Sequence, residues 1–383
     1  MNWRVPLADL DYGQEEEAAV LKVLHSKWLT MGAITQEFED KFRQAVGVRY
    51  AIAVSNATEA LHLACLALGI GPGDEVITPS LSFVATSNAV LYTGADVRFA
   101  DVIGPDDLTI DPEDIAHRVT PQTKAIIVMH YGGYPCRMKE ILAIAEKYGI
   151  SVIEDAAHAP GASLDGKALG SWSTIGCFSF FSNKNLSTGE GGMLVTDRDD
   201  VAEKVRLLRS HGMTTLTYDR HHGHAYSYDV VDLGYNYRID EVRSVLGLEQ
   251  LKKLVVNNGR RKAWTERYWQ ALANSGVGLP FKDKKGVPSY HIFPILLPNS
   301  IDRKIFMDSL RAEGIQTSIH YPPIHRFTYY RSRYGNISLP RTEDISEHEV
   351  TLPLYPGMTE QKVDLVTEIV IKSEKLLYDI NKG

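Results

Sequence analysis

Short apolar runs alternate with amphipathic segments along the first two thirds of the chain. The runs are nearly continuous in apolar character, which is typical of strands buried on both faces of a parallel sheet. Between them, apolar residues recur every three or four positions, as in helices. This alternation predicts an α/β fold with helices on both faces of one sheet. The predicted strands are YAIAVS (50–55), DEVITPS (74–80), DVRFADV (96–102), KAIIVMHYGG (124–133) and ISVIEDAAH (150–158), and the predicted helices cover residues 14–24, 58–69, 83–92, 111–119 and 138–147.

The pattern changes after one long amphipathic stretch, residues 241–272, which we expect to be a helix that bridges two lobes. From about residue 276, two apolar runs predict strands, SYHIFPILLP (289–298) and IQTSIHYPP (315–323). Two amphipathic segments, 303–313 and 359–377, predict helices beside them. The sequence therefore predicts a large lobe, residues 1–255, and a smaller C-terminal α+β lobe, residues 256–383.

Composition narrows the class of protein. A chain of 383 residues with 44% hydrophobic and 23% charged residues is ordinary for a soluble protein of two lobes. The net charge of -7 argues against a nucleic-acid partner, and no stretch is apolar enough to span a membrane. The N-terminus has no apolar signal core, and Cys65, Cys136 and Cys177 lack metal-ligand spacing. We therefore expect a cytoplasmic protein with reduced thiols.

Polar or aromatic groups follow several of the predicted strands, where ligands of α/β sheets collect. Asn56, Ala57 and Thr58 lie between a strand and a helix, so free backbone N–H groups there could bind a phosphate or form an ordinary helix cap. Phe83 lies just past another strand end. Its ring could cover a planar ligand, or it could be a core residue.

Two adjacent carboxylates, Glu154 and Asp155, end the strand at 150–158, and His158 follows three residues later. Successive strand residues point to opposite faces, so only one carboxylate can enter a site. A buried carboxylate needs a cationic partner, and a protonated pyridine nitrogen would serve. A metal ligand or a helix cap are alternatives for Asp155, and a structural role is the alternative for His158.

One lysine, Lys184, stands between an apolar strand and a glycine cluster in FSFFSNKNLSTGEGG (178–192). It lies 29 residues after Asp155 (184 − 155), so one connection between neighbouring strands fits in the interval. A lysine shielded from water becomes a usable nucleophile, whereas a solvated loop lysine does not. Phosphate, ring and carboxylate features occur in the order that one cofactor requires, which favours the reactive amine.

The combined motifs make the chain resemble the DegT/DnrJ/EryC1/StrS family of nucleotide-sugar aminotransferases, which depend on pyridoxal 5'-phosphate (PLP). The resemblance extends over essentially the whole chain. It implies the aspartate aminotransferase (fold type I) architecture, in which helices sandwich a mostly parallel seven-stranded sheet. It is carried by WLTMG, SNATEALHLA, GDEVITPSLSFVAT, VIEDAAHA, SFFSNKNLSTGEGG, LGYNYRIDEVRSVLGLEQL, HYPPIH and LPLYPGMT.

The resemblance also assigns roles to residues. By position, Lys184 matches the lysine that binds the cofactor covalently, and Asp155 matches the partner of the pyridine nitrogen. The remaining matches are Phe83 stacked on the ring, His158 near its phenolic oxygen, Ala57, Thr58 and Ser179 at the phosphate, Asn236 (with Arg238 as a weaker candidate) reaching the phosphate of a neighbouring subunit, and His320, Tyr321 and His325 bordering the sugar nucleotide. Alanine at position 57 replaces the glycine of many members and keeps the backbone N–H.

The implied reaction moves an amino group from L-glutamate to a nucleotide-linked keto-sugar in a homodimer with sites at the subunit interface. WLTMG resembles members that aminate C4 of 4-keto-6-deoxy sugars; 3-keto sugars and a non-catalytic, PLP-binding regulatory protein are alternatives. Lys184 argues against the related sugar dehydratases, which have histidine there. The histidines of TYDRHHGHAYSYD (217–229) suggest an active-site loop or ordinary solvated side chains rather than a metal site.

Overall fold

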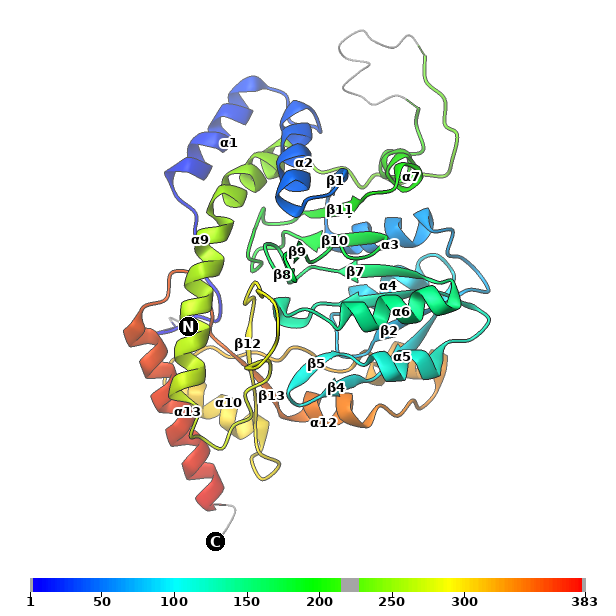
Figure 1. The fold of residues 1–383 in the computed structure, drawn as a ribbon. Helices are drawn as coiled ribbons and strands as arrows, with labels where there is room; N and C mark the ends of the chain where they lie inside the picture. Colours follow the sequence, from blue (N-terminus) through cyan, green and yellow to red (C-terminus); the bar gives the residue numbers. More distant parts are fainter. Residues whose placement is uncertain (1–2, 215–226, 381–383) are drawn as a thin grey trace.

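A seven-stranded sheet forms the centre of the protein in the computed structural model, which describes residues 3–214 and 227–380 (Figure 1). The strand order is β1-β11-β10-β7-β6-β2-β3, and β11 alone is antiparallel to its neighbours. The predicted, mostly parallel sheet is thereby confirmed. Its strands are β1 (Tyr50–Val54), β2 (Glu75–Pro79), β3 (Asp96–Ala100), β6 (Thr123–Met129), β7 (Ser151–Asp155), β10 (Ile175–Ser179) and β11 (Gly192–Thr196).

Helices cover both faces of this sheet, as the alternating pattern predicts. Side chains of β6 show how the faces are separated: Ile127 packs with α3 on one face, and Ile126 packs with α6 on the other. The first face carries α3 (Ala57–Ala67), α4 (Ala85–Leu91) and α7 (Asp199–Arg209), and the second carries α2 (Ala33–Val46), α5 (Pro112–Arg118) and α6 (Met138–Tyr148). Smaller elements complete this part: β4 (Val102–Gly104) with β5 (Asp107–Ile110), β8 (Ser163–Leu164) with β9 (Lys167–Ala168), and η1 (Tyr131–Gly133).

The long helix α9 (Glu241–Ala271) runs from the N-terminal helices to the C-terminal helix (Figure 1). Beside it lie α1 (Gln14–Ser26), α10 (Arg303–Ala312), α13 (Glu360–Ile380) and the antiparallel pair β12 (Phe293–Leu296) and β13 (Glu349–Leu352). Between β12 and β13, the elements η2 (Ile324–Arg326), α11 (Thr328–Tyr334) and α12 (Pro340–His348) return toward the sheet, where Tyr330 joins the α3 core. Residue 255, the predicted lobe boundary, lies within α9, and the division stays a prediction.

The strand predicted at 315–323 is wrong. Only isolated bridges occur there, between Ile315 and Val5 and between Ser318 and Thr351. The two partners come from different parts of the chain and meet the segment on single residues. The segment then ends in Pro322 and Pro323, which have no N–H to extend a ladder.

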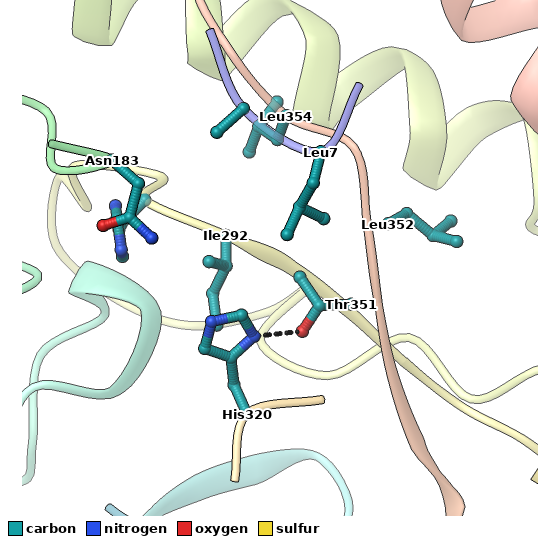
Figure 2. Close-up of a pocket in the computed structure, with 9 residues that line it drawn as sticks. Leu7, Asn183, Ile292, His320, Thr351, Leu352 and Leu354 are labelled. Atoms are coloured by element: carbon teal, nitrogen blue, oxygen red, sulfur yellow. Dashed lines mark hydrogen bonds between the residues drawn. The ribbon is translucent and has the colours of Figure 1, made fainter. Parts of the chain in front are cut away.

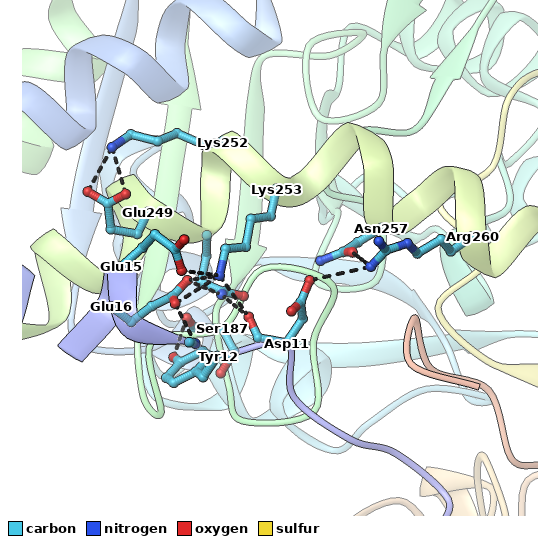
Figure 3. A network of polar contacts seen from close by, with 12 residues as sticks. Asp11, Tyr12, Glu15, Glu16, Ser187, Glu249, Lys252, Lys253, Asn257 and Arg260 are labelled. Atoms are coloured by element: carbon cyan, nitrogen blue, oxygen red, sulfur yellow. Dashed lines mark hydrogen bonds and ion pairs between the residues drawn. The ribbon is translucent and has the colours of Figure 1, made fainter. Parts of the chain in front are cut away.

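Residues 4–16, here called the N-terminal strap, tie α9 to the loop that carries Lys184 (Figure 3). The Tyr12 hydroxyl donates to the Ser187 carbonyl oxygen over 2.8 Å. From α9, Lys253 Nζ donates to the buried Glu16 carboxylate over 2.8 Å, and Gln250 Nε2 donates to the Asp11 carbonyl oxygen over 2.8 Å. The strap therefore fixes the back of the lysine loop. Across residues 3–214 and 227–380, every helix is too short or too polar to cross a membrane.

Candidate active site

The floor of the candidate site is built from three neighbouring strand ends. Met129 on β6 pairs with Asp155 on β7, and Ser179 ends β10 beside them. All three side chains lie on the α3 face because residues two apart on a strand share a face. They open into a pocket of about 680 Å³. The predicted residues that line it are Ala57, Thr58, Phe83, Asp155, His158, Ser179, Lys184, His320 and Tyr321.

Asp155 is a buried carboxylate with a side facing the pocket. Thr86 Oγ1 on α4 donates to its Oδ2 over 2.7 Å, and the Ala157 amide donates to its Oδ1 over 3.2 Å. Burial raises the pKa of Asp155, and these hydrogen bonds oppose the rise. A carboxylate in this setting is stabilised by a cation placed in the pocket.

Lys184 lies in the loop after β10 and faces the same pocket as Asp155. Burial of the amine lowers its pKa from 10.5 to about 7, and the nearby negative charge of Asp155 opposes that change. A large fraction of the amine is therefore neutral and nucleophilic near neutral pH. The lysine is neither a solvated loop residue nor part of an ion pair with Asp155 at contact distance. The sequence prediction that both residues face one pocket is confirmed.

The N-terminus of α3 forms one end of the pocket. Asn56 caps the helix by accepting a hydrogen bond from the Glu59 amide over 3.0 Å. The amides of Ala57 and Thr58 precede that bond and belong to the first turn, where N–H groups have no intrahelical acceptor. Asn56 therefore caps the helix, its neighbours Ala57 and Thr58 line the pocket, and the phosphate site stays a prediction. Gly192 lets β11 pass close, since a Cβ there would come within 2.5 Å of the Asn56 carbonyl carbon.

Aromatic and imidazole groups form the walls. The Phe83 side chain is 56% exposed and lines the pocket, so it is not a core residue. The Gly132 amide donates to His158 Nδ1 over 3.2 Å, which leaves the hydrogen of this buried imidazole on Nε2. His158 Nε2 lies 3.0 Å from the Tyr321 hydroxyl oxygen, to which it can therefore donate. The hydroxyl hydrogen of Tyr321 is left free for another acceptor.

Three predicted residues, Asn236, Arg238 and His325, do not line the pocket of this single chain. Asn236 is exposed and forms a bridge with Ser210. His325 is buried, with Nδ1 at 2.7 Å from Ser80 Oγ and Nε2 at 3.0 Å from Glu343 Oε1. The histidines at 221, 222 and 224 fall outside the described residues. Within residues 3–214 and 227–380, no group of three or more histidine, cysteine or acidic residues could hold a metal ion.

Several residues of the site were not predicted. Tyr237 lines the pocket and places its hydroxyl 3.2 Å from His62 Nδ1. It stands inside GYNYR, a motif already singled out, so it could have been named. Thr86 and His291 gave no such signal: their roles come from contacts with Asp155 and Lys184, which lie far away in the chain.

Comparison with known proteins agrees with this geometry. Residues 11–371 match the DegT/DnrJ/EryC1/StrS aminotransferase family. Helicobacter pylori PseC, an aminotransferase involved in pseudoaminic acid biosynthesis, is 29% identical, with a TM-score of 0.91 over 97% of this chain and 99% of PseC. Spr1654 of Streptococcus pneumoniae in its PLP-form is 26% identical, with a TM-score of 0.91 over 97% and 99%. DesI, solved in the presence of its TDP-sugar product, is 29% identical, with a TM-score of 0.87 over 99% and 95%.

Proposed function

Because the chain belongs to the DegT/DnrJ/EryC1/StrS family of PLP-dependent sugar aminotransferases, we propose that it moves the amino group of L-glutamate to a nucleotide-linked 4-keto-6-deoxy sugar. One observation carries the proposal: Lys184, an amine with a lowered pKa, and Asp155, a buried carboxylate, face one pocket that is also lined by the N-terminus of α3. An aminotransferase needs these three features together.

Pyridoxal phosphate fits the residues of this pocket. Asp155 offers a carboxylate with room for a cationic ring nitrogen, and the Phe83 ring is exposed to the pocket, where it can cover a planar group. The amides of Ala57 and Thr58 and the hydroxyl of Ser179 suit a phosphate. When bound, the cofactor's ring withdraws electrons from the reacting carbon.

The chain's own residues supply the proton transfers. With a pKa of about 7, Lys184 can take a proton from the Cα of the donor and return one to the acceptor in the second half-reaction. Glutamate and the keto-sugar occupy the same pocket in turn, so we expect ping-pong kinetics. Tyr321 has a hydroxyl hydrogen available for an acceptor in the pocket, because His158 donates to its oxygen.

The substrate and the partner subunit are the finer parts of the proposal. DesI is known with a TDP-sugar product, which supports a nucleotide-linked sugar here. WLTMG supports amination at C4, and His320 and Tyr321 line the pocket where a sugar would enter. Asn236 lies outside the pocket of its own chain and on the surface, as expected of a residue that serves the site of a second copy. The proposed location is the cytoplasm, which is consistent with three buried, unpaired cysteines.

The proposal is tested by incubating the protein with glutamate and a panel of 4-keto and 3-keto sugars linked to dTDP, UDP or GDP. We expect amine transfer to a 4-keto substrate; transfer only at C3 would make the 3-keto sugar the substrate. Lys184→Ala should abolish transfer and the yellow colour of the bound cofactor. Wild-type turnover by Lys184→Ala would overturn the role of this lysine, and a yellow protein inactive on the whole panel would favour a regulatory role.

A further inference from the structure

A buried histidine from the C-terminal third of the chain lies beside the Lys184 amine. His291 Nε2 is 3.5 Å from Lys184 Nζ, at the outer limit of a hydrogen bond that rotation about the last lysine torsion can shorten. Together with Asn183 and His320 (Figure 2), His291 lines a small cavity of about 20 Å³. It does not line the pocket of about 680 Å³, so it reaches the Lys184 amine from outside that pocket.

The side chain of Asn185 has one allowed orientation. Its Nδ2 lies 2.6 Å from the Ser289 carbonyl oxygen and 2.8 Å from Asn258 Oδ1. The Asn258 amide is fixed in turn, because its Nδ2 donates to the Pro160 carbonyl oxygen over 2.9 Å. Backbone carbonyl oxygens only accept, so the amide nitrogen of Asn185 must face them. Its Oδ1 then faces His291 Nδ1 over 2.9 Å.

This contact sets the tautomer of His291. Asn185 Oδ1 only accepts, so Nδ1 of the imidazole carries the hydrogen. Burial and the neighbouring His158 and Lys184 lower the pKa of His291 well below its usual value, so the ring is neutral. Its Nε2 lone pair consequently points at the Lys184 amine. Arg261 holds the backbone in this position by donating to the His291 carbonyl oxygen over 3.2 Å.

We propose that His291 is a positioning residue that accepts a hydrogen bond from the Lys184 amine whenever that amine is not attached to the cofactor, and that Asn185 holds His291 in the accepting tautomer. The proposal rests on the proposed role of Lys184 as the reactive amine. A free lysine amine can rotate about several torsions, and one acceptor behind it directs the nitrogen lone pair toward the pocket. Proton transfer then starts from an aligned amine.

Other groups near the pair do not replace this contact. Asp155 acts on Lys184 through its charge, and Arg261 lies on the far side of His291. The His158 ring, 4.3 Å from the His291 ring, gives its Nε2 hydrogen to Tyr321. The remaining imidazole nearby, His320, has its Nδ1 at 2.8 Å from Thr351 Oγ1 (Figure 2).

Two matched variants separate positioning from packing. In His291→Asn the amide takes the place of Nδ1, which keeps the Asn185 contact and removes the acceptor behind Lys184. In His291→Gln the amide oxygen can take the place of Nε2, which keeps that acceptor. We expect kcat to fall roughly tenfold in His291→Asn with KM for glutamate unchanged, and to stay within about threefold of wild type in His291→Gln, as expected for one hydrogen bond.

A readout without the cofactor completes the test. The cofactor-free protein is pulse-labelled with acetic anhydride across pH, and acetylation of Lys184 is followed by mass spectrometry. Loss of a neutral acceptor disfavours the ammonium form, so the labelling midpoint should fall by about half a pH unit or more in His291→Asn and hold in His291→Gln. The proposal is overturned if His291→Asn and wild type have equal labelling midpoints and equal kcat. It is also overturned if both variants lose kcat equally while their labelling midpoints stay unchanged.

The wild-type protein supplies a test that no substitution can spoil by misfolding. Nitrogen NMR of histidine-labelled, cofactor-free protein should show His291 as the Nδ1–H tautomer; an Nε2–H or charged ring would overturn the proposal. Failure of the proposed function would give a different experimental result. In that case Lys184→Ala keeps wild-type turnover, whereas failure of the His291 proposal leaves Lys184→Ala inactive.

Discussion

Two adjacent carboxylates at the end of β7 have the same chemistry, and both are buried. Glu154 Oε2 accepts from the Gly170 amide over 2.7 Å and lies 3.0 Å from His130 Nε2, and its Oε1 accepts from the Ser173 amide over 2.8 Å. Asp155, on the opposite face, accepts from Thr86 and Ala157 and keeps one side toward the pocket.

The difference shows that burial of an acid does not by itself mark a functional site. The hydrogen-bond donors around Glu154 are other groups of the protein, and they surround the carboxylate. The Glu154 side chain therefore holds the loop at 170–173 against the sheet. Asp155 keeps hydrogen-bond acceptor capacity on the side that faces the pocket, where a ligand can use it. A single step along a strand separates the two environments, because the side chains alternate between faces.

The largest effect on activity is expected from Asp155→Asn. The amide keeps the size of the side chain and removes the charge that stabilises a cationic ring nitrogen. We expect kcat to fall on the order of 10²–10³-fold, comparable to the loss of one preorganised electrostatic group. Steady-state kinetics with glutamate checks this, and the urea midpoint should stay near that of wild type. Activity within threefold of wild type would contradict the role of Asp155.

Glu154→Leu should lower stability and leave turnover per folded molecule nearly unchanged. It leaves His130 and the amides of Gly170 and Ser173 buried without their acceptor, and we expect unfolding free energy to fall by about 3–5 kcal/mol. Equilibrium urea unfolding measures the loss. Turnover per folded molecule should stay within a few-fold of wild type, with Glu154→Gln as a milder control. A variant that is stable but inactive would put Glu154 in the reaction.

The pH at which Lys184 becomes reactive should respond to Asp155 and not to Glu154, and this effect is smaller. In cofactor-free protein, Lys184 should become reactive toward acetic anhydride with a midpoint near pH 7, set by its lowered pKa. Asp155→Asn should move the midpoint lower still, because Asp155 favours the ammonium form, while Glu154→Gln should leave it unchanged. The folded protein binds fewer protons here than the unfolded chain between about pH 7 and 10.5, so this group makes folding more favourable as pH rises through that window.

The smallest effect is expected from Thr86→Val, which removes one hydrogen bond to Asp155 and keeps the shape of the side chain. A bond of this kind contributes about 1 kcal/mol, or less than tenfold in rate. Thr86→Ser retains the hydroxyl and should match wild type. Stopped-flow measurement of the glutamate half-reaction compares the two variants, and a loss as large as that of Asp155→Asn would mean that Thr86 has a further role.

The sequence was sufficient for the sheet and for residues attached to its strand ends. Asp155 and Lys184 could be placed because strand period and connection length determine where they lie, whereas Ser179 was placed by the family resemblance. The sequence could not decide whether Phe83 lies in the core or in the site, since an apolar ring is found in both places. Its exposure settles the question against the core.

Contacts between distant segments could not be predicted. His291 and Asn185 are 106 residues apart, and nothing local to either one predicts their hydrogen bond. His325 was expected beside the sugar nucleotide, but it is bonded to Ser80 and Glu343. The apolar run at 315–323 satisfies a strand pattern, yet its neighbours meet it on isolated residues.

The N-terminal strap also constrains how the chain assembles during translation. The Arg4 and Val5 amides donate to the Gly314 carbonyl oxygen over 2.9 and 3.2 Å, and the Leu354 amide donates to the Leu7 carbonyl oxygen over 3.1 Å. A ribosome makes the strap before it makes these partners. Every strand of the central sheet has been synthesised by Thr196, so the sheet can form while the strap still lacks its docking surface. Residues 4–7 of the strap thus reach their partners after the sheet has been made, whereas residues 11–16, which support the loop behind Lys184, can dock as soon as α9 has been made.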